Sequence, residues 1–159
     1  MLEVRVICVG KLKEAYWRDA CAEYAKRLGG FCRFSIVELP ESRLPDDPSQ
    51  AQIDAALRAE GEKILAAAKG GVVIPLCIEG QQATSEQLSA KLDAFALDGH
   101  STLCFVIGSS FGLDGSVKQA GSWNLSMSRM TFPHQLARVM LCEQLYRAFQ
   151  ISHGGKYHK

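Results

Sequence analysis

Strand-like and helix-like segments alternate along this chain, and that alternation constrains its fold more than any other feature. Short apolar runs at 2–10, 31–39, 72–78 and 101–107 are typical of strands, and the segments between them carry apolar residues at helical spacing. Strands that alternate with helices favour an α/β fold, with a mostly parallel sheet flanked by helices. No internal repeat or linker divides the sequence, so we predict a single domain over residues 1–159.

Start and stop signals mark the predicted helices. Ser49 and Thr84 are residue types that cap helix N-termini, and Pro133 suits a first helical position. The predicted helices cover residues 14–28, 49–68, 84–97 and 133–150. Pro75 lies inside the third strand-like run, where it favours an edge strand or a local irregularity.

The composition excludes several classes of protein. Hydrophobic residues make up 47% of the chain and charged residues 22%, which lies outside the range of disordered sequences. No apolar run approaches the ~20 residues that span a bilayer, and the start of the chain lacks the apolar segment of a signal peptide. We therefore expect a soluble, cytoplasmic protein with no membrane partner.

Cysteine spacing and net charge limit the chemistry further. The six cysteines include no Cys-x-x-Cys pair, so we expect small buried hydrophobic side chains rather than a zinc site or another metal centre. The formal net charge of +1 gives no overall attraction to nucleic acid. Any affinity for RNA therefore has to come from a local patch or from an assembled surface.

Two predicted strands end in segments that suit a ligand. Ligands of open α/β sheets gather at the carboxyl ends of the strands, here near Leu76 and at the turn Gly108–Gly112. The turn has neither Gly-x-Gly-x-x-Gly nor Gly-Lys-Ser/Thr, so a nucleotide ligand that needs no phosphate grip suits it best. The alternative is that its glycines only form a tight turn.

The segment Leu125–His134 is a third candidate, rich in hydroxyl, methionine and aromatic side chains. Its backbone groups can read the edge of an adenine while Met127, Met130 and Phe132 flank the face of the ring. The alternative is a turn whose Met and Phe side chains only pack the core.

The last predicted helix and the tail after it carry mixed signals. The apolar stripe of the helix is rich enough for both the core and a partner helix, which keeps dimerisation open. Glu143 and Arg147 have the spacing of an ordinary ion pair on one helix face. In the tail, Tyr157 and His158 offer stacking surfaces beside two lysines, a combination that binds looped RNA. The alternative is a fraying terminus.

These motifs occur in an order and spacing that resemble one family. The matching segments are Val9–Trp17, Tyr24–Leu28, Phe105–Gly108, Phe111–Leu113, Leu125–Arg138, Glu143–Phe149 and Tyr157–Lys159. They are similar to the SPOUT-class ribosomal RNA large subunit methyltransferases, which modify N3 of a pseudouridine in bacterial 23S ribosomal RNA. The resemblance covers essentially the whole chain and rests on no single short motif.

The resemblance implies a SPOUT-type α/β fold with a C-terminal trefoil knot, S-adenosylmethionine as methyl donor, and a homodimer. The implied partner is 23S ribosomal RNA in the large subunit or the assembled ribosome. The implied donor contacts are Leu76, Gly108, Met127, Ser128, Arg129, Met130, Thr131 and Phe132. They fall in the two strand ends and the loop already marked by their residue types.

One departure from the family concerns the turn after the fourth strand. The family usually has Gly-Gly-Ser-x-Gly-Leu there, whereas this chain has Ser109 at the second position. If that position needs a positive φ, Ser109 costs roughly 1 kcal/mol or more and weakens donor binding. Ser109 is also the only support for a rival hypothesis, a nonenzymatic ribosome- or RNA-binding dimer. A nucleotide-binding oxidoreductase is disfavoured because the glycine fingerprint is missing.

Methylation of N3 requires that the protein align the methyl group with the base and help to remove the N3 proton. The base also has to leave its stack. Four residues are the candidates to lie near it: His134, Arg138, Tyr157 and His158. Arg138 would hold negative charge on the uracil ring or a phosphate, and the proton acceptor stays open between His134, His158 and water. We expect a composite site, in which one protomer binds the donor and its partner's tail covers the RNA.

Overall fold

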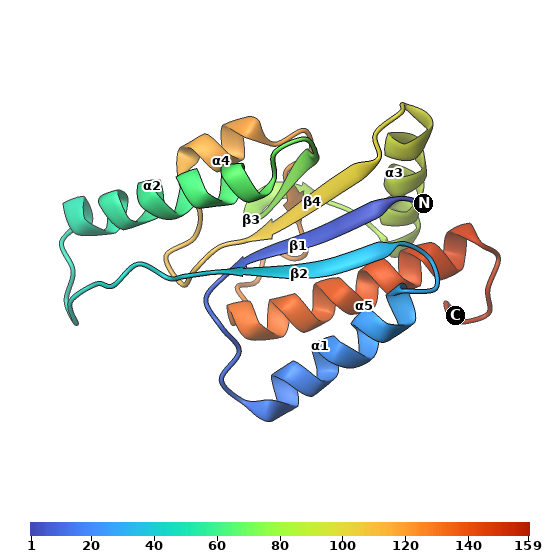
Figure 1. Cartoon of the computed structure of the whole chain (residues 1–159), viewed down its shortest axis with the longest axis horizontal. Helices are drawn as coiled ribbons and strands as arrows, with labels where there is room; N and C mark the ends of the chain where they lie inside the picture. Colours follow the sequence, from blue (N-terminus) through green and yellow to red (C-terminus); the bar gives the residue numbers. More distant parts are fainter.

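Five parallel strands form one sheet in the computed structural model, which describes residues 1–159, and helices cover both faces (Figure 1). The strand order is β2-β1-β4-β3-β5. The strands are β1 (Glu3–Val9), β2 (Arg33–Leu39), β3 (Val72–Gln82), β4 (Thr102–Ile107) and β5 (Leu125–Ser126). The helices are α1 (Ala15–Leu28), α2 (Gln50–Ala67), α3 (Ser85–Leu97), α4 (Gly115–Ala120) and α5 (His134–Ser152). The predicted α/β fold with a mostly parallel sheet is confirmed.

Alternate residues of the central strands enter two separate cores. Val4 and Val6 of β1 pack with residues of α1, α3 and α5, while Ile7 and Val9 pack with residues of α2 and α4. Figure 1 shows the same division, with α1 and α5 below the sheet and α2 and α4 above it. Because both faces are covered, the strands read as nearly continuous apolar runs.

The helix signals in the sequence are confirmed at two N-termini. The Ser49 hydroxyl accepts a hydrogen bond from the Gln52 amide, and the Gln52 side chain accepts one from the Ser49 amide. Thr84 and Gln87 form the same reciprocal capping box at α3. Pro133 lies one residue before α5, at its N-cap, so the predicted start was one residue early. None of the helices is both long and apolar enough to cross a membrane.

The prediction for Pro75 is half right. β3 lies between β4 and β5 and is therefore not an edge strand. The predicted irregularity is present: the pairing of β3 with β4 ends at Pro75, and its register with β5 shifts between Leu76 and Gln81. Proline has no N–H to donate to a ladder, so the strand changes neighbours at this point.

The cysteines behave as predicted at five of six positions. All six are free thiols, and only Cys77 is not buried. Burial raises the pKa of the Cys8 thiol to about 12, so this group stays neutral in the core.

Candidate functional site

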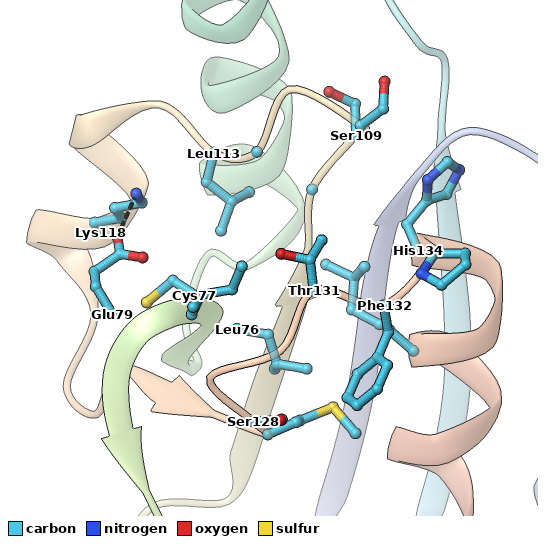
Figure 2. A pocket seen from close by; sticks show the side chains of 18 residues that line it. Leu76, Cys77, Glu79, Ser109, Leu113, Lys118, Ser128, Thr131, Phe132 and His134 are labelled. Atoms are coloured by element: carbon cyan, nitrogen blue, oxygen red, sulfur yellow. Dashed lines mark hydrogen bonds and ion pairs between the residues drawn. The ribbon is translucent and has the colours of Figure 1, made fainter.

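A cavity of about 570 Å³ opens at the carboxyl end of β4 and beside the middle of β3, just after the pairing of these two strands ends at Pro75 (Figure 2). β3, which runs on to Gln82, contributes Leu76–Glu79, and the turn after β4 contributes residues on both sides of Phe111. The loop between β5 and α5 forms a third wall, and α4 adds Lys118. The cavity thus lies where ligands of parallel sheets bind, and it joins the three segments that the sequence had singled out.

The turn after β4 places its backbone demands on two glycines. A side chain at Gly108 would collide with the carbonyl oxygen of Gly112. Gly112 has φ of +91°, and its amide donates to the Ser109 carbonyl over 2.9 Å. No residue other than glycine has a positive φ, so the strain that we considered for Ser109 is absent. The hypothesis of a lost donor site therefore loses its only support.

The loop before α5 is shaped by short-range hydrogen bonds. The Ser126 hydroxyl donates to the Ser128 carbonyl over 2.9 Å, and the Ser128 hydroxyl accepts from the Met130 amide over 3.0 Å. This double turn directs Met127 and Ser128 into the cavity and leaves Met130 72% exposed.

Six of the eight predicted donor-binding residues line the cavity, namely Leu76, Gly108, Met127, Ser128, Thr131 and Phe132. Arg129 and Met130 lie outside it. The lining combines apolar walls with hydroxyl groups and exposed backbone, and its volume falls in the range of small-molecule sites. These features fit S-adenosylmethionine, whose adenosine needs apolar contact and edge hydrogen bonds and which has no phosphate.

Sequence reasoning missed the charged part of the cavity. Lys118 and Glu79 form an ion pair of 2.5 Å at one side of it, seen as a dashed line in Figure 2. The hydrogen bond from Lys118 lowers the pKa of the Glu79 carboxyl, so Glu79 is charged at neutral pH. Glu79 lies in β3, three residues after Leu76, and was open to prediction, but no local pattern connects Lys118 with it.

The four predicted catalytic residues lie in three places within one protomer. His134, the first residue of α5, lines the donor-type cavity. Arg138 is 2% exposed, and its guanidinium donates to the Glu38 carboxylate over 2.6 Å and to the Gly10 carbonyl over 3.2 Å. It lines a second cavity of about 440 Å³, together with Lys11 and Arg18, rather than the first one.

Tyr157 and His158 lie further along α5, where the tail packs against the helix instead of fraying. The Tyr157 hydroxyl donates to the Glu143 carboxylate over 2.7 Å, and the Arg147 guanidinium carbon lies 4.7 Å from the Tyr157 ring centre. The predicted ion pair between Glu143 and Arg147 is confirmed at 2.7 Å. His158 Nδ1 lies 3.1 Å from Arg147 Nη1. Nine residues of helix, roughly 14 Å, separate His134 from Glu143, so the tail does not reach the cavity of its own protomer.

These contacts shift the titration of the tail. Burial and the hydrogen bond to Glu143 raise the pKa of the Tyr157 hydroxyl above its ordinary value. Burial raises the pKa of Glu143, but hydrogen bonds from Arg147 and Tyr157 outweigh it and leave the pKa below its ordinary value. Both shifts favour a neutral tyrosine beside a charged carboxylate.

Known proteins are similar to this chain over nearly its whole length. A family model described as "Predicted SPOUT methyltransferase" matches residues 2–158. The chain belongs to the SPOUT methyltransferase family. Two full-length relatives, from Exiguobacterium sibiricum and Streptococcus thermophilus, are 45% and 46% identical over 159 residues. The matches cover 99% of this chain and 100% of each relative, and both relatives are named "Ribosomal RNA large subunit methyltransferase H".

Two solved structures share the fold of this chain at lower identity. A methylase family protein from Haemophilus influenzae superimposes with a TM-score of 0.54 at 14% identity, covering 100% of this chain and 72% of that one. A methylase family protein from Neisseria gonorrhoeae gives 0.52 at 14% identity, covering 90% and 81%. At this identity the likeness concerns the fold alone. For this SPOUT methyltransferase, the cavity at β3 and β4 is the candidate donor site.

Proposed function

We propose that this protein methylates ribosomal RNA of the large subunit, using S-adenosylmethionine as methyl donor and N3 of a pseudouridine in 23S ribosomal RNA as acceptor. The observation that carries the proposal is the complete donor-type cavity, in a chain whose full-length relatives bear the name of that class of enzyme. The protein would act in the cytoplasm, where ribosomes are assembled.

The donor side of the site is built within one protomer. Leu76, Phe132 and Met127 supply apolar contact for adenine, and the backbone of the turn at Gly108 can approach the ligand closely because no side chain intervenes. S-adenosylmethionine supplies an electrophilic methyl group when it is bound. The walls restrict its position and exclude water, which is the chain's contribution to alignment.

The acceptor side needs residues that one protomer keeps apart. His134 lies on the donor cavity, whereas Tyr157 and His158 are held beside Glu143 and Arg147. We therefore propose a homodimer with a composite site, in which the partner's tail covers the RNA. Leu136, Val139 and Met140 of α5 are only partly buried and offer an apolar surface to a second copy.

In that composite site His134, His158 or a water molecule takes the N3 proton. Arg138 would favour the anionic form of the uracil ring or hold a phosphate. Its guanidinium is already neutralised by Glu38 inside the protomer, so Arg138 would act after rearrangement of that ion pair or by positioning β2 and α5.

The direct test is methylation of 23S ribosomal RNA in large subunits or ribosomes from cells that lack the gene. Purified protein and S-adenosylmethionine should add one methyl group, which mass spectrometry of the RNA locates on a pseudouridine. RNA that stays unmodified while the protein binds S-adenosylmethionine would contradict the proposal and favour a nonenzymatic RNA-binding role.

Removal of Lys156–Lys159 tests the assignment of the tail. We expect loss of at least 100-fold in methylation rate with donor affinity changed less than twofold, because the deleted residues do not line the donor cavity. Methylation at the rate of the intact protein would show that the tail has no part in the RNA site. Calorimetric titration with S-adenosylhomocysteine supplies the binding control.

A further inference from the structure

The donor cavity contains one acidic and one permanently basic side chain, and the two are paired with each other. Lys118 Nζ of α4 lies 2.5 Å from Glu79 Oε1 of β3. The side chains are 36% and 62% exposed, so the pair lies at the mouth of the cavity rather than on its floor. Apart from His134, every other lining residue is apolar or neutral.

A neutral lining does not complement the whole of the proposed donor. Adenine and ribose are neutral and suit apolar walls with hydroxyl and backbone partners. The amino-acid end carries a carboxylate and an ammonium group, and charges that leave water need partners of opposite sign. The cavity offers one cation and one anion, in adjacent positions, at a single place.

We propose that Lys118 and Glu79 bind the amino-acid end of the donor, Lys118 through the carboxylate and Glu79 through the ammonium group. This inference rests on the proposed function, because it assumes that the cavity takes S-adenosylmethionine. It adds a charged, specificity-determining pair to the predicted donor contacts that line the cavity, which are all apolar or neutral.

The energetics of such an exchange are favourable. An exposed ion pair contributes only about 0–1 kcal/mol, so separating Lys118 from Glu79 costs little. In the complex each side chain keeps a partner of opposite charge, and the ligand gains two charge-assisted hydrogen bonds. In the free protein the two side chains neutralise each other, so the mouth of the cavity carries no isolated charge.

Ligands that have an amino-acid end should depend on Lys118 and Glu79 for binding, and ligands that lack one should not. S-adenosylhomocysteine has both charged groups, whereas 5′-methylthioadenosine keeps the adenosine and the thioether without them. Lys118 and Glu79 should therefore contribute to binding of the first ligand and not of the second.

The test is calorimetric titration of both ligands into wild-type protein, Lys118→Met and Glu79→Gln. We expect each substitution to weaken S-adenosylhomocysteine about tenfold and to change the affinity for 5′-methylthioadenosine less than twofold. Glu23→Gln is a matched control, because it breaks another exposed ion pair, with Arg27, far from the cavity. That control should leave both affinities unchanged, and thermal unfolding verifies that all variants are folded.

Equal weakening of both ligands would overturn the inference, since the pair would then only shape the cavity. Variants that bind S-adenosylhomocysteine as tightly as the wild type would overturn the inference as well. In either case the proposed function would stand as long as the wild-type protein binds S-adenosylhomocysteine and methylates the RNA. Failure of the wild-type protein to bind either ligand would instead contradict the proposed function, and the inference with it.

Discussion

The loop before α5 and the tail after it are held by different kinds of interaction. The loop is fixed by hydrogen bonds between residues two positions apart, around Ser126 and Ser128, and by glycines in the facing turn. The tail is fixed by side chains, through Tyr157, Arg147 and Glu143. Backbone geometry therefore builds the donor wall, whereas charge and aromatic contact place the tail.

The loop and the tail should therefore respond to different kinds of substitution. A wall made of backbone turns is sensitive to an added side chain and insensitive to pH. A tail held by a charged network tolerates changes in side-chain size but is sensitive to changes in side-chain charge. Leu125–Lys159, which looks like one functional stretch in the sequence, therefore contains two regions that can be perturbed separately.

Among the single substitutions, Gly108→Ala should give the largest effect, and only on the donor side. Its added carbon collides with the Gly112 carbonyl, so we expect at least tenfold weaker binding of S-adenosylhomocysteine and about 1–3 kcal/mol lower stability. Titration calorimetry and thermal unfolding measure the two quantities.

Gly115→Ala serves as the control for this substitution, because an added carbon there meets no atom within 4 Å. It should leave both quantities unchanged. Full donor affinity in Gly108→Ala would mean that the turn can move and that its backbone does not form the donor wall.

Glu143→Gln should give a smaller effect, and only on the tail. The neutral side chain no longer pairs with Arg147, and its hydrogen bond to Tyr157 becomes weaker. We expect a loss of about 1 kcal/mol in the docking of the tail, seen as several-fold faster removal of the last residues by a carboxypeptidase. If the affinity for S-adenosylhomocysteine fell in parallel, the tail would support the cavity of its own protomer, and the loop and the tail could not be perturbed separately.

The pH dependence should give the smallest effect near neutrality and separate the regions again. The pKa of Glu143 lies below its ordinary 4.5, so its contribution is complete above that pH and is lost as the pH falls through the lowered value. The pKa of Tyr157 lies above its ordinary 10.0, so its contribution is complete below that pH and is lost as the pH rises through the raised value.

We therefore expect the contributions of Glu143 and Tyr157 to the protection of the tail from carboxypeptidase to be constant between about pH 5 and pH 9 and to fall outside that window. Because carboxypeptidases have their own pH profile, hydrogen exchange of the tail amides, corrected for intrinsic rates, is the better measurement. A decline centred near pH 7 would mean that a histidine, and not Glu143 or Tyr157, controls docking.

Local signals in the sequence were sufficient for most of the fold. Ser49 and Thr84 were read as caps because capping depends on residues three positions apart. Gly108 was marked because it follows the end of an apolar run, and β4 does end there. Leu76 was marked for the same reason, although β3 continues to Gln82, and the loop at Met127 was marked by its hydroxyl, methionine and aromatic side chains. β5 was missed because two residues are too few to show a period of two.

Features that depend on distant partners were not predictable. Arg138 is one turn of helix after His134 and was expected beside it near the base, yet its guanidinium turns to Glu38, 100 residues earlier in the chain. Lys118 meets Glu79 only because α4 packs beside β3. A buried or paired charged side chain pairs with whichever oppositely charged residue the fold brings next to it. A single sequence does not show which residue that partner is.

A mixed dimer tests most directly whether one protomer binds the donor while its partner's tail covers the RNA. One protomer carries Gly108→Ala and the other lacks Lys156–Lys159, and two affinity tags isolate the dimer that contains one of each. With S-adenosylmethionine kept below its dissociation constant, we expect both parent dimers to methylate 23S ribosomal RNA at least tenfold more slowly than the wild type. The mixed dimer should regain about half of the wild-type rate, because one intact cavity meets one intact tail. A mixed dimer as inactive as its parents would contradict the composite site.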